Sequence, residues 1–280
     1  MTATHVFSVD VEEYFHVQAF EPYIDAQTWE SFPSRVDVGL DLLLDALAAG
    51  HHRGTFFVVG WLAERRPHMI RRLIDAGHEV ASHGYWHRRV DVLGPHQFRE
   101  DLRRSRAILE QLAGTAITGF RAPSFSINAH TPWAFEILAE EGFQYDSSVF
   151  PARRPSFGIP ESAVMPYDVP SASGVIREFP LTTLRWLGAR WPAAGGNYWR
   201  QLPAALVEAA VAQHEREGHS AMIYVHPWEL DAGQPRLDVP GIVKLRHYRG
   251  LARMEGRIRR LLSHHRFGSI RDVHFAARAA

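Results

Sequence analysis

The regular alternation of short apolar runs with longer amphipathic segments restricts the fold of this chain more than any other feature. The apolar runs have the length and residue types of buried strands, and the segments between them mostly carry apolar residues at helical spacing. An alternation at this spacing predicts a parallel sheet that is covered by helices on both faces or closed into a barrel. Runs of the strand type lie at residues 4–9, 55–59, 78–82, 117–120, 175–179 and 221–225. Helical patterns lie at residues 34–50, 67–77, 96–112, 131–142 and 203–217.

Local signals mark where some of these helices begin and end. Ser34 is a candidate N-cap for the first helix, and Gly50 ends it. Thr131 followed by Pro132 has the pattern of an N-cap with proline at the first helical position. The stretch 151–173 is rich in Pro, Ser and Ala and is predicted to be a long loop.

The composition excludes several classes of protein. With 46% apolar and 22% charged residues, the chain has the make-up of a globular domain rather than of a disordered segment or a coiled coil. Its 31 basic residues balance its 31 acidic ones, so the net charge gives no sign of a nucleic-acid partner. Because cysteine is absent, any metal must be bound by histidine, aspartate or glutamate.

The sequence shows no targeting or membrane-spanning segment. The first ten residues, MTATHVFSVD, have neither a basic n-region nor an apolar h-region. No stretch approaches the 18 or so consecutive apolar residues of a transmembrane helix. We therefore expect a soluble, cytoplasmic protein with no membrane span.

The segment 244–278 is strongly basic. It carries ten basic residues against Glu255 and Asp272. It is interpreted as a solvated amphipathic helix, with a patch that binds an acidic polymer or partner as the alternative. The apolar stripe that such a helix would bury consists of Leu251, Met254, Ile258, Leu261 and Leu262.

An acidic string follows the first predicted strand. Alternate residues of an extended chain share a face, so Asp10 and Glu12 point together and Glu13 points away. One of the two carboxylates can bind a metal while the other acts as a base, and a solvated acidic turn is the alternative. His16 lies four residues beyond Glu12 and is a rival ligand, which we interpret as a supporting or packing residue.

Two histidines four residues apart follow another predicted strand, in the segment SHGYWH. His83 and His87 can reach one metal from a tight loop or a helix face. Their position strengthens the hypothesis, because the loops at the carboxyl ends of barrel strands carry the active sites of such folds. A second pattern, HEREGH at 214–219, resembles a zinc-protease helix, but its histidines are five residues apart and do not share a helix face.

Two further polar residues end predicted strands. Arg121 ends one strand in GFRAPS, where its guanidinium can bind a carboxylate through two hydrogen bonds and fix its orientation. His226 ends the apolar run MIYV and is either a buried, hydrogen-bonded histidine or a general acid. Together with Asp10 and His83, these residues place four polar groups at four strand ends, which predicts a single site.

These motifs, in this order, resemble the polysaccharide deacetylases, carbohydrate esterase family 4. The similar segments are FSVDVEEYF, TFFVVG, GHEVASHGYWH, FRAPSFS and GFQYDSS, followed by the late strand that ends at His226. The segments SVDVEEYF, GGNYWR and HPWELD are most similar to a subgroup associated with exopolysaccharide loci of the exosortase type. The resemblance implies a single α/β domain over 1–280, a distorted (β/α)7-type barrel with a subgroup-specific C-terminal extension, about 150–280, packed onto it.

The resemblance also implies roles for the residues at the strand ends. His83 and His87 would bind the metal, most simply zinc, and Glu12 would be the third ligand, since Val11 stands where the common family form has a second aspartate. Asp10 would be the catalytic base, Arg121 would orient it, and His226 would be the general acid. The backbone N–H of Ser124 could bind the oxyanion. Candidates to line a sugar groove are Trp86, Tyr198, Trp199 and Trp228.

The function that follows is hydrolysis of N-acetyl groups on a hexosamine-containing glycan, with release of acetate. Two alternatives stay open. One is a related metal-dependent hydrolase of small cyclic amides or ureides, for which a closed pocket rather than an open groove is expected. The other is a non-catalytic module that binds or assembles glycans.

Overall fold

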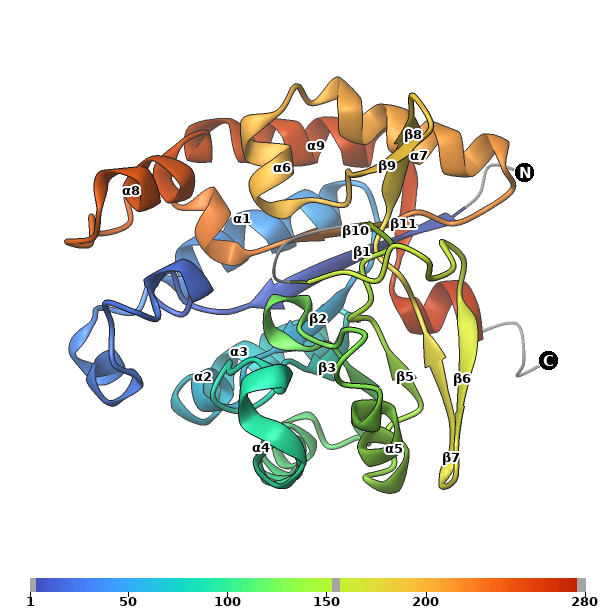
Figure 1. The fold of residues 1–280 in the computed structure, drawn as a ribbon. Coiled ribbons are helices and arrows are strands. Elements are labelled where there is room, and N and C mark those ends of the chain that lie inside the picture. Colours follow the sequence, from blue (N-terminus) through green and yellow to red (C-terminus); the bar gives the residue numbers. More distant parts are fainter. Residues whose placement is uncertain (1–3, 153–156, 276–280) are drawn as a thin grey trace.

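The computed structural model describes residues 4–152 and 157–275, and a mostly parallel nine-stranded sheet runs through it (Figure 1). The strand order is β10-β1-β2-β3-β4-β5-β7-β6, with β11 also paired to β1, and only the β6–β7 pair is antiparallel. Because the other strands are parallel, their carboxyl ends meet at one edge. The strands are β1 Thr4–Val11, β2 Thr55–Val58, β3 Glu79–Ser82, β4 Gly119–Phe120, β5 Tyr145–Asp146, β6 Tyr167–Ser171, β7 Gly174–Glu178, β10 Met222–Val225 and β11 Arg266–Gly268.

The α/β class predicted from the sequence is confirmed. The expected closure into a barrel is not detected, since no pairing among the described strands joins β10 to β6.

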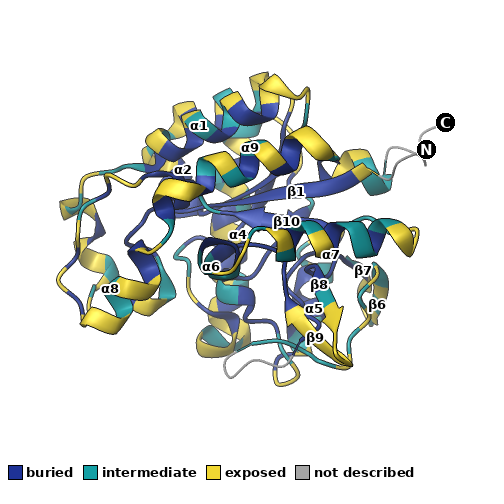
Figure 2. Ribbon diagram, turned by 90° about the horizontal axis from the view of Figure 1, so that it is seen from above, coloured by how far each residue is buried: buried dark blue, intermediate teal, exposed yellow. Residues whose placement is uncertain are grey.

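Helices surround the sheet. Figure 1 shows α6, α7 and α9 above β1 and β10, α2 and α3 beside β2 and β3, and α4 and α5 below these strands. Strands β1 and β10 are buried along their length, apart from the exposed Thr4 (Figure 2). The helices are α1 Val36–Ala49, α2 Gly60–Arg65, α3 Pro67–Asp75, α4 Val90–Ala113, α5 Trp133–Glu140, α6 Gly196–Gln201, α7 Ala205–Arg216, α8 Gly241–Tyr248 and α9 Met254–His264.

The C-terminal half of the chain is built into the sheet as well as packed onto it. Strand β10 lies beside β1 in parallel register, with Val9 paired to Val225, and β11 pairs with the beginning of β1. Helix α9 buries Met254, Ile258 and Leu261 of the predicted apolar stripe. It covers only part of the basic segment, which also contains the end of α8 and the strand β11. This arrangement places the end of β10 next to the end of β1, where the acidic string begins.

Several local predictions differ from the structure. Ser34 is not the N-cap of α1, which is Arg35; the Ser34 hydroxyl instead donates to Glu13. Helix α4 begins six residues earlier than expected. It kinks at Gly94, which has a φ of 70° and lies directly before Pro95. The segment 151–173, predicted to be a loop, contains the strand β6. Residues 153–156 of this segment lie outside the described residues.

A two-stranded ribbon stands apart from the main sheet. It consists of β8 (Thr183–Trp186) and β9 (Ala189–Pro192), and the sequence patterns did not predict it. None of the described helices is long and apolar enough to cross a membrane.

Candidate metal centre and active site

Three of the predicted ligands converge at the carboxyl edge of the sheet. Glu12 comes from the loop after β1, and His83 and His87 from the loop after β3; their ligand atoms all lie within 4.8 Å of one another. The Nε2 atom of His87 is 2.5 Å from Oε2 of Glu12. A carboxylate and two imidazoles form a common ligand set for a catalytic zinc ion, which keeps a further position open.

The hydrogen bonds around the cluster prepare these residues for a metal. His83 Nδ1 lies 2.8 Å from the carbonyl oxygen of Arg121. A carbonyl only accepts, so Nδ1 carries the hydrogen and Nε2 keeps a free lone pair. The indole N–H of Trp228 donates to Oε1 of Glu12 at 2.8 Å, which fixes the carboxylate from behind. The donor set therefore fits a divalent metal.

The protonation states agree with this assignment. Burial lowers the pKa of His83 to about 4, so its imidazole is neutral at neutral pH. Burial acts to raise the pKa of the Glu12 carboxyl, but the neighbouring imidazoles, His87 above all, hold that pKa well below its usual range. A neutral imidazole and an ionised carboxylate are the forms that bind metal.

The loop that carries His87 is held in an uncommon conformation. His87 has a φ of 50°, in the left-handed region that few non-glycine residues occupy. The buried carboxylate of Asp101, on α4, accepts hydrogen bonds from the backbone N–H groups of Tyr85 and Trp86 at 2.7 and 3.0 Å. These bonds shape the turn that brings His87 back toward His83.

Asp10 lies beside the cluster and is fixed by a buried arginine. Arg121 Nη1 contacts Oδ1 of Asp10 at 2.7 Å, and neither side chain is more than 3% exposed. The same guanidinium donates to Ser8 Oγ and to the carbonyl and hydroxyl oxygens of Ser147, and it lies 4.1 Å from the centre of the Phe57 ring. With so many partners the guanidinium cannot turn, so it sets the direction of the Asp10 carboxylate.

His226 faces Asp10 and Glu12 from the end of β10. Its Nε2 is 3.9 Å from Oδ2 of Asp10 and 3.8 Å from Oε1 of Glu12. On its other side, Nδ1 lies 3.0 Å from Oε2 of Glu229, which is ion-paired to the buried Arg200 at 2.7 Å. Burial acts to lower the pKa of His226, but the surrounding carboxylates, Glu229 first, outweigh it and raise the pKa to about 9.

Sequence reasoning missed Glu229, Arg200 and Asp101. Glu229 had a local signal, because His226 and Glu229 form a capping box around the short 3₁₀ turn Pro227–Leu230. Arg200 had none, since it reaches Glu229 from another helix, α6. Asp101 lies within a helical pattern and reads there as an ordinary polar position.

Two other residues near the acidic string, Glu13 and His16, do not belong to the cluster of ligand atoms. Glu13 points away from it and accepts hydrogen bonds from the backbone N–H groups of Arg35 and Val36, at the start of α1. His16 stacks against His87 at 6.0 Å between ring centres, and its Nδ1 accepts the backbone N–H of Glu13. The geometry therefore brings Glu12, and neither Glu13 nor His16, together with the histidine pair.

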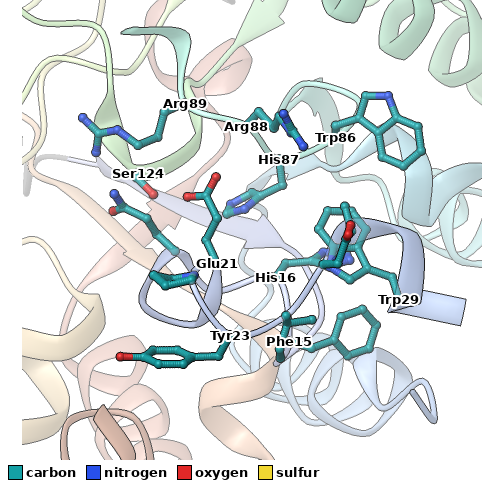
Figure 3. Close-up of a pocket in the computed structure, with 15 residues that line it drawn as sticks. Phe15, His16, Glu21, Tyr23, Trp29, Trp86, His87, Arg88, Arg89 and Ser124 are labelled. Atoms are coloured by element: carbon teal, nitrogen blue, oxygen red, sulfur yellow. The ribbon is translucent and has the colours of Figure 1, made fainter. Parts of the chain in front are cut away.

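Two cavities meet at the cluster. The first, of about 240 Å³, contains Asp10, Glu12, His83 and His226 in its wall. The second, of about 500 Å³, lies on the far side of His87, with aromatic and charged side chains around it (Figure 3). Gln18, His87 and Ser124 line both cavities. The two cavities therefore adjoin and form one extended recess.

The aromatic candidates fall into different places. Tyr198 and Trp228 line the cavity at the cluster, and Trp86 lines the second cavity. Trp199 does not belong with them: it is 1% exposed and packs in the hydrophobic core, so its prediction as a groove residue is wrong. Helix α6 has too few residues for a periodic pattern to show that Tyr198 faces the cavity while its neighbour Trp199 is buried.

Ser124 lies at the junction of the two cavities in a strained backbone. Ser124 and Phe125 have φ values of 56° and 53°. Such conformations cost free energy and persist where the surrounding structure imposes them, often at functional sites. The strain turns the FRAPSF segment sharply beside the cluster.

The fold and the site together define a class of protein. It is an α/β protein in which two histidines and a carboxylate can hold one metal, next to an arginine-bound aspartate, at the carboxyl ends of parallel strands. Residues 26–145 match the family described as Polysaccharide deacetylase, and residues 147–274 match a domain of unknown function (DUF3473). Residues 26–145, somewhat less than half of the chain, are thus similar to the polysaccharide deacetylase family.

Individual relatives agree with this assignment. The chain is 33% identical over 113 residues to a peptidoglycan deacetylase of Helicobacter pylori, which covers 40% of this chain and 38% of the relative. It is 38% identical over 82 residues to a chitooligosaccharide deacetylase of Sinorhizobium fredii, covering 29% of this chain and 38% of the relative. The chain thus matches about two fifths of the length of these relatives.

A solved structure extends the likeness to nearly the whole fold. The structure described as a putative polysaccharide deacetylase from Mycobacterium smegmatis superposes with a TM-score of 0.57 at 24% identity. The match covers 93% of this chain and 95% of that one. The C-terminal half, including β10, therefore belongs to the shared architecture.

Proposed function

We propose that this protein is a metal-dependent hydrolase that removes N-acetyl groups from a hexosamine-containing glycan and releases acetate. The observation that carries the proposal is the arrangement of Asp10 and His226 beside the Glu12–His83–His87 cluster. A base and an acid thus flank one candidate metal position. A zinc ion held there would polarise the acetamide carbonyl and activate a water molecule.

Asp10 serves as the base in this proposal. Its Oδ1 is tied to Arg121, while Oδ2 faces the cavity side occupied by His226. Oδ2 is therefore the oxygen that can accept a proton as water attacks the acetamide carbon. Because Asp10 is not among the three clustered ligands, it keeps an oxygen available for proton transfer.

His226 serves as the acid. An amine leaves readily only when it is protonated, so a donor must lie near the scissile nitrogen. With a pKa raised to about 9, the imidazole of His226 carries its proton at neutral pH. The Glu229 carboxylate on Nδ1 holds the ring so that Nε2–H points toward Asp10 and the cluster.

The extended recess favours a glycan over a small ring as substrate. A cyclic amide needs one enclosed pocket, whereas the cavity at the cluster continues past His87 and Ser124 into the second cavity. Relatives of this chain are named as deacetylases of peptidoglycan and of chitooligosaccharides, which are acetylated amino-sugar polymers. The motifs SVDVEEYF, GGNYWR and HPWELD further lead us to propose an exopolysaccharide of the exosortase-associated type as the natural polymer.

The decisive experiment measures acetate release from acetylated chitooligosaccharides by protein purified without chelator. Activity is expected, with loss on dialysis against a chelator and recovery on addition of zinc. Asp10→Asn is the matched control for contaminating deacetylases. Hydrolysis of cyclic imides or ureides alone would identify the related small-amide hydrolase. Metal-free protein with no activity on either substrate would identify a non-catalytic glycan-binding module.

A further inference from the structure

The β8–β9 ribbon carries an exposed apolar tip that the candidate active site does not use. The strands pair in antiparallel register, with Trp186 opposite Ala189, so Leu187 and Gly188 form a two-residue turn. Leu187 is 85% exposed, which is the highest exposed fraction of any large apolar residue in the described part of the chain. The ribbon shares no strand pairing with the main sheet.

Leu187 is an unfavourable residue for this turn. Both turn residues have positive φ, 51° for Leu187 and 76° for Gly188, as a type I′ turn requires. Asn or Gly is preferred at the first of these positions, because a branched side chain is strained there. Leu187 therefore gains neither burial nor local conformational preference from the fold, which points to a contact outside this chain.

Two tryptophans extend the apolar tip along one face of the ribbon. Trp186 and Trp191 are 56% and 48% exposed, and their ring centres lie 6.3 Å apart. The other tryptophans of the described residues are buried or half-buried. Leu184, opposite Trp191, lies on the same face by the alternation of the strands.

The opposite face is basic. Arg185 and Arg190 are paired directly across the two strands, a placement that is unfavourable for like charges. Arg185 lies 3.6 Å from Glu217, and Arg190 donates to the carbonyl oxygens of Pro160 and Ser162. No acidic residue occurs in the ribbon itself, 183–192.

The ribbon is firmly attached at its base. The backbone N–H of Arg185 donates to the Gln213 side chain on α7, and Ala193 donates to the Thr182 carbonyl. The tip is thus presented at a fixed place on the molecule (Figures 1 and 2), where both strands lie at the surface.

We propose that the tip of the β8–β9 ribbon docks on an anionic lipid surface. Tryptophan prefers the interface between headgroups and acyl chains, an exposed leucine can enter the acyl region, and arginines bind anionic headgroups. A glycan is a poorer match, because sugars stack on aromatic faces and have no use for an aliphatic side chain at the tip. The docking is independent of the hydrolase activity proposed above.

The test is co-sedimentation of the full chain with lipid vesicles. The wild type is expected to bind vesicles of phosphatidylcholine and phosphatidylglycerol in equal parts, and to bind phosphatidylcholine alone about tenfold more weakly, since each arginine near an anionic surface adds to the attraction. Leu187→Asn is expected to reduce binding about tenfold or more, because it replaces the apolar tip by a polar amide. The double variant Trp186→Ala/Trp191→Ala is expected to reduce it further.

Leu187→Asn separates docking from folding. Asparagine suits the turn better than leucine, so the variant is expected to unfold at the same or a higher temperature while it loses vesicle binding. Val175→Asp, on the exposed end of β7, is the matched control, and it should bind vesicles as the wild type does. Absence of wild-type binding to either vesicle, or equal binding by wild type and Leu187→Asn, would overturn the proposal. So would binding of soluble acetylated glycan that depends on Trp186 and Trp191.

Discussion

The two ends of strand β1 each carry a cluster of two histidines and one glutamate, and the two clusters differ in what they can do. At the carboxyl end, Glu12 meets His83 and His87; near the amino end, His5 meets Glu215 and His265. Both sets bring their ligand atoms within 4.8 Å, so compactness alone does not tell them apart.

The hydrogen bonds outside each cluster make the difference. His83 gives its Nδ1 hydrogen to a carbonyl and so turns a lone pair toward the cluster. In His5, Nδ1 accepts the backbone N–H of Ala221, so Nε2 carries the hydrogen and donates it to Glu215 at 2.9 Å. A protonated nitrogen cannot bind a metal. The cluster at the amino end is therefore a hydrogen-bonded link that joins β1 to α7 and to the end of α9.

The comparison teaches that a metal site is defined by its second layer of partners as much as by its ligands. The carboxyl-end cluster also has a neighbouring aspartate and histidine, Asp10 and His226, whose side chains lie 3.9 Å apart. In the other cluster, the Glu215 carboxylate contacts both His5 and His265.

Replacing the carboxylate of Asp10 or of Glu12 by an amide separates an effect on turnover from an effect on metal binding. Asp10→Asn is expected to lower the turnover number by roughly 10²–10⁴, the usual range for an acid–base group, with bound metal retained. Glu12→Gln should instead lower metal affinity. Turnover on acetylated chitooligosaccharides and metal content by elemental analysis measure the two effects. Exchanged phenotypes would mean that Glu12 is the base and Asp10 the ligand.

Removing one residue from each cluster tests the contrast directly. His83→Ala is expected to lose roughly 100-fold or more in zinc affinity, since loss of a mere supporting partner already costs 10–100-fold. Glu215→Ala is the matched variant and should keep the wild-type affinity. Competition with a chromophoric chelator gives both values. Equal losses in the two variants would show that both clusters bind metal.

The indole behind Glu12 should matter to a smaller extent. Trp228→Phe keeps most of the packed ring but removes the N–H that donates to Oε1 of Glu12. We expect metal affinity to fall about tenfold with little change in unfolding temperature. The exposed Trp186→Phe is the control. An unchanged affinity in Trp228→Phe would show that the indole only fills space.

The amino-end cluster should affect stability and its pH dependence. Burial lowers the pKa of His5, and hydrogen bonds from His5 and His265 outweigh burial and lower the pKa of Glu215. Groups with a lowered folded-state pKa stabilise the protein above their unfolded pKa, and this stabilisation is lost as pH falls. Glu215→Gln is thus expected to cost about 1–2 kcal/mol at pH 7 and less in acid. The smaller cost is expected only below the ordinary glutamate pKa of 4.5, as pH falls through the lowered pKa of Glu215. Chemical unfolding from pH 7 to pH 3 measures this, and a cost as large at pH 3 as at pH 7 contradicts the assignment.

Much of the site could be predicted because its residues lie at the ends of strands. Asp10 and Glu12 share a face by the period of an extended chain, and the structure places both at the cluster with Glu13 turned away. His83 and His87 are close in sequence, so one loop suffices to bring them together. These relations depend only on local geometry, which the sequence carries.

Other features were out of reach for equally physical reasons. The ribbon of β8 and β9 turns at Leu187, whose residue type gives no turn signal. The exposure of its two tryptophans, Trp186 and Trp191, depends on what packs around the ribbon. Trp199 was misassigned because the burial of its indole depends on which distant segments pack against α6, and this indole lies in the hydrophobic core. Arg200, which is ion-paired to the Glu229 carboxylate behind His226, comes from another helix, α6, which the sequence patterns did not connect with Glu229.

Sequence patterns were sufficient to predict the α/β class, the order of most elements, and the residue types at the carboxyl edge of the sheet. Periodicity and short-range spacing are sufficient for these, since they follow from the geometry of strands and helices. The sequence patterns could not predict which of two similar His–Glu clusters presents a free lone pair, or which residues support His226. Those outcomes depend on hydrogen bonds between segments about thirty to more than two hundred residues apart. Examples are Arg200 with Glu229, His83 with the Arg121 carbonyl, and His5 with Ala221. No local pattern encodes such pairs, because they form only when the sheet has brought distant strands side by side.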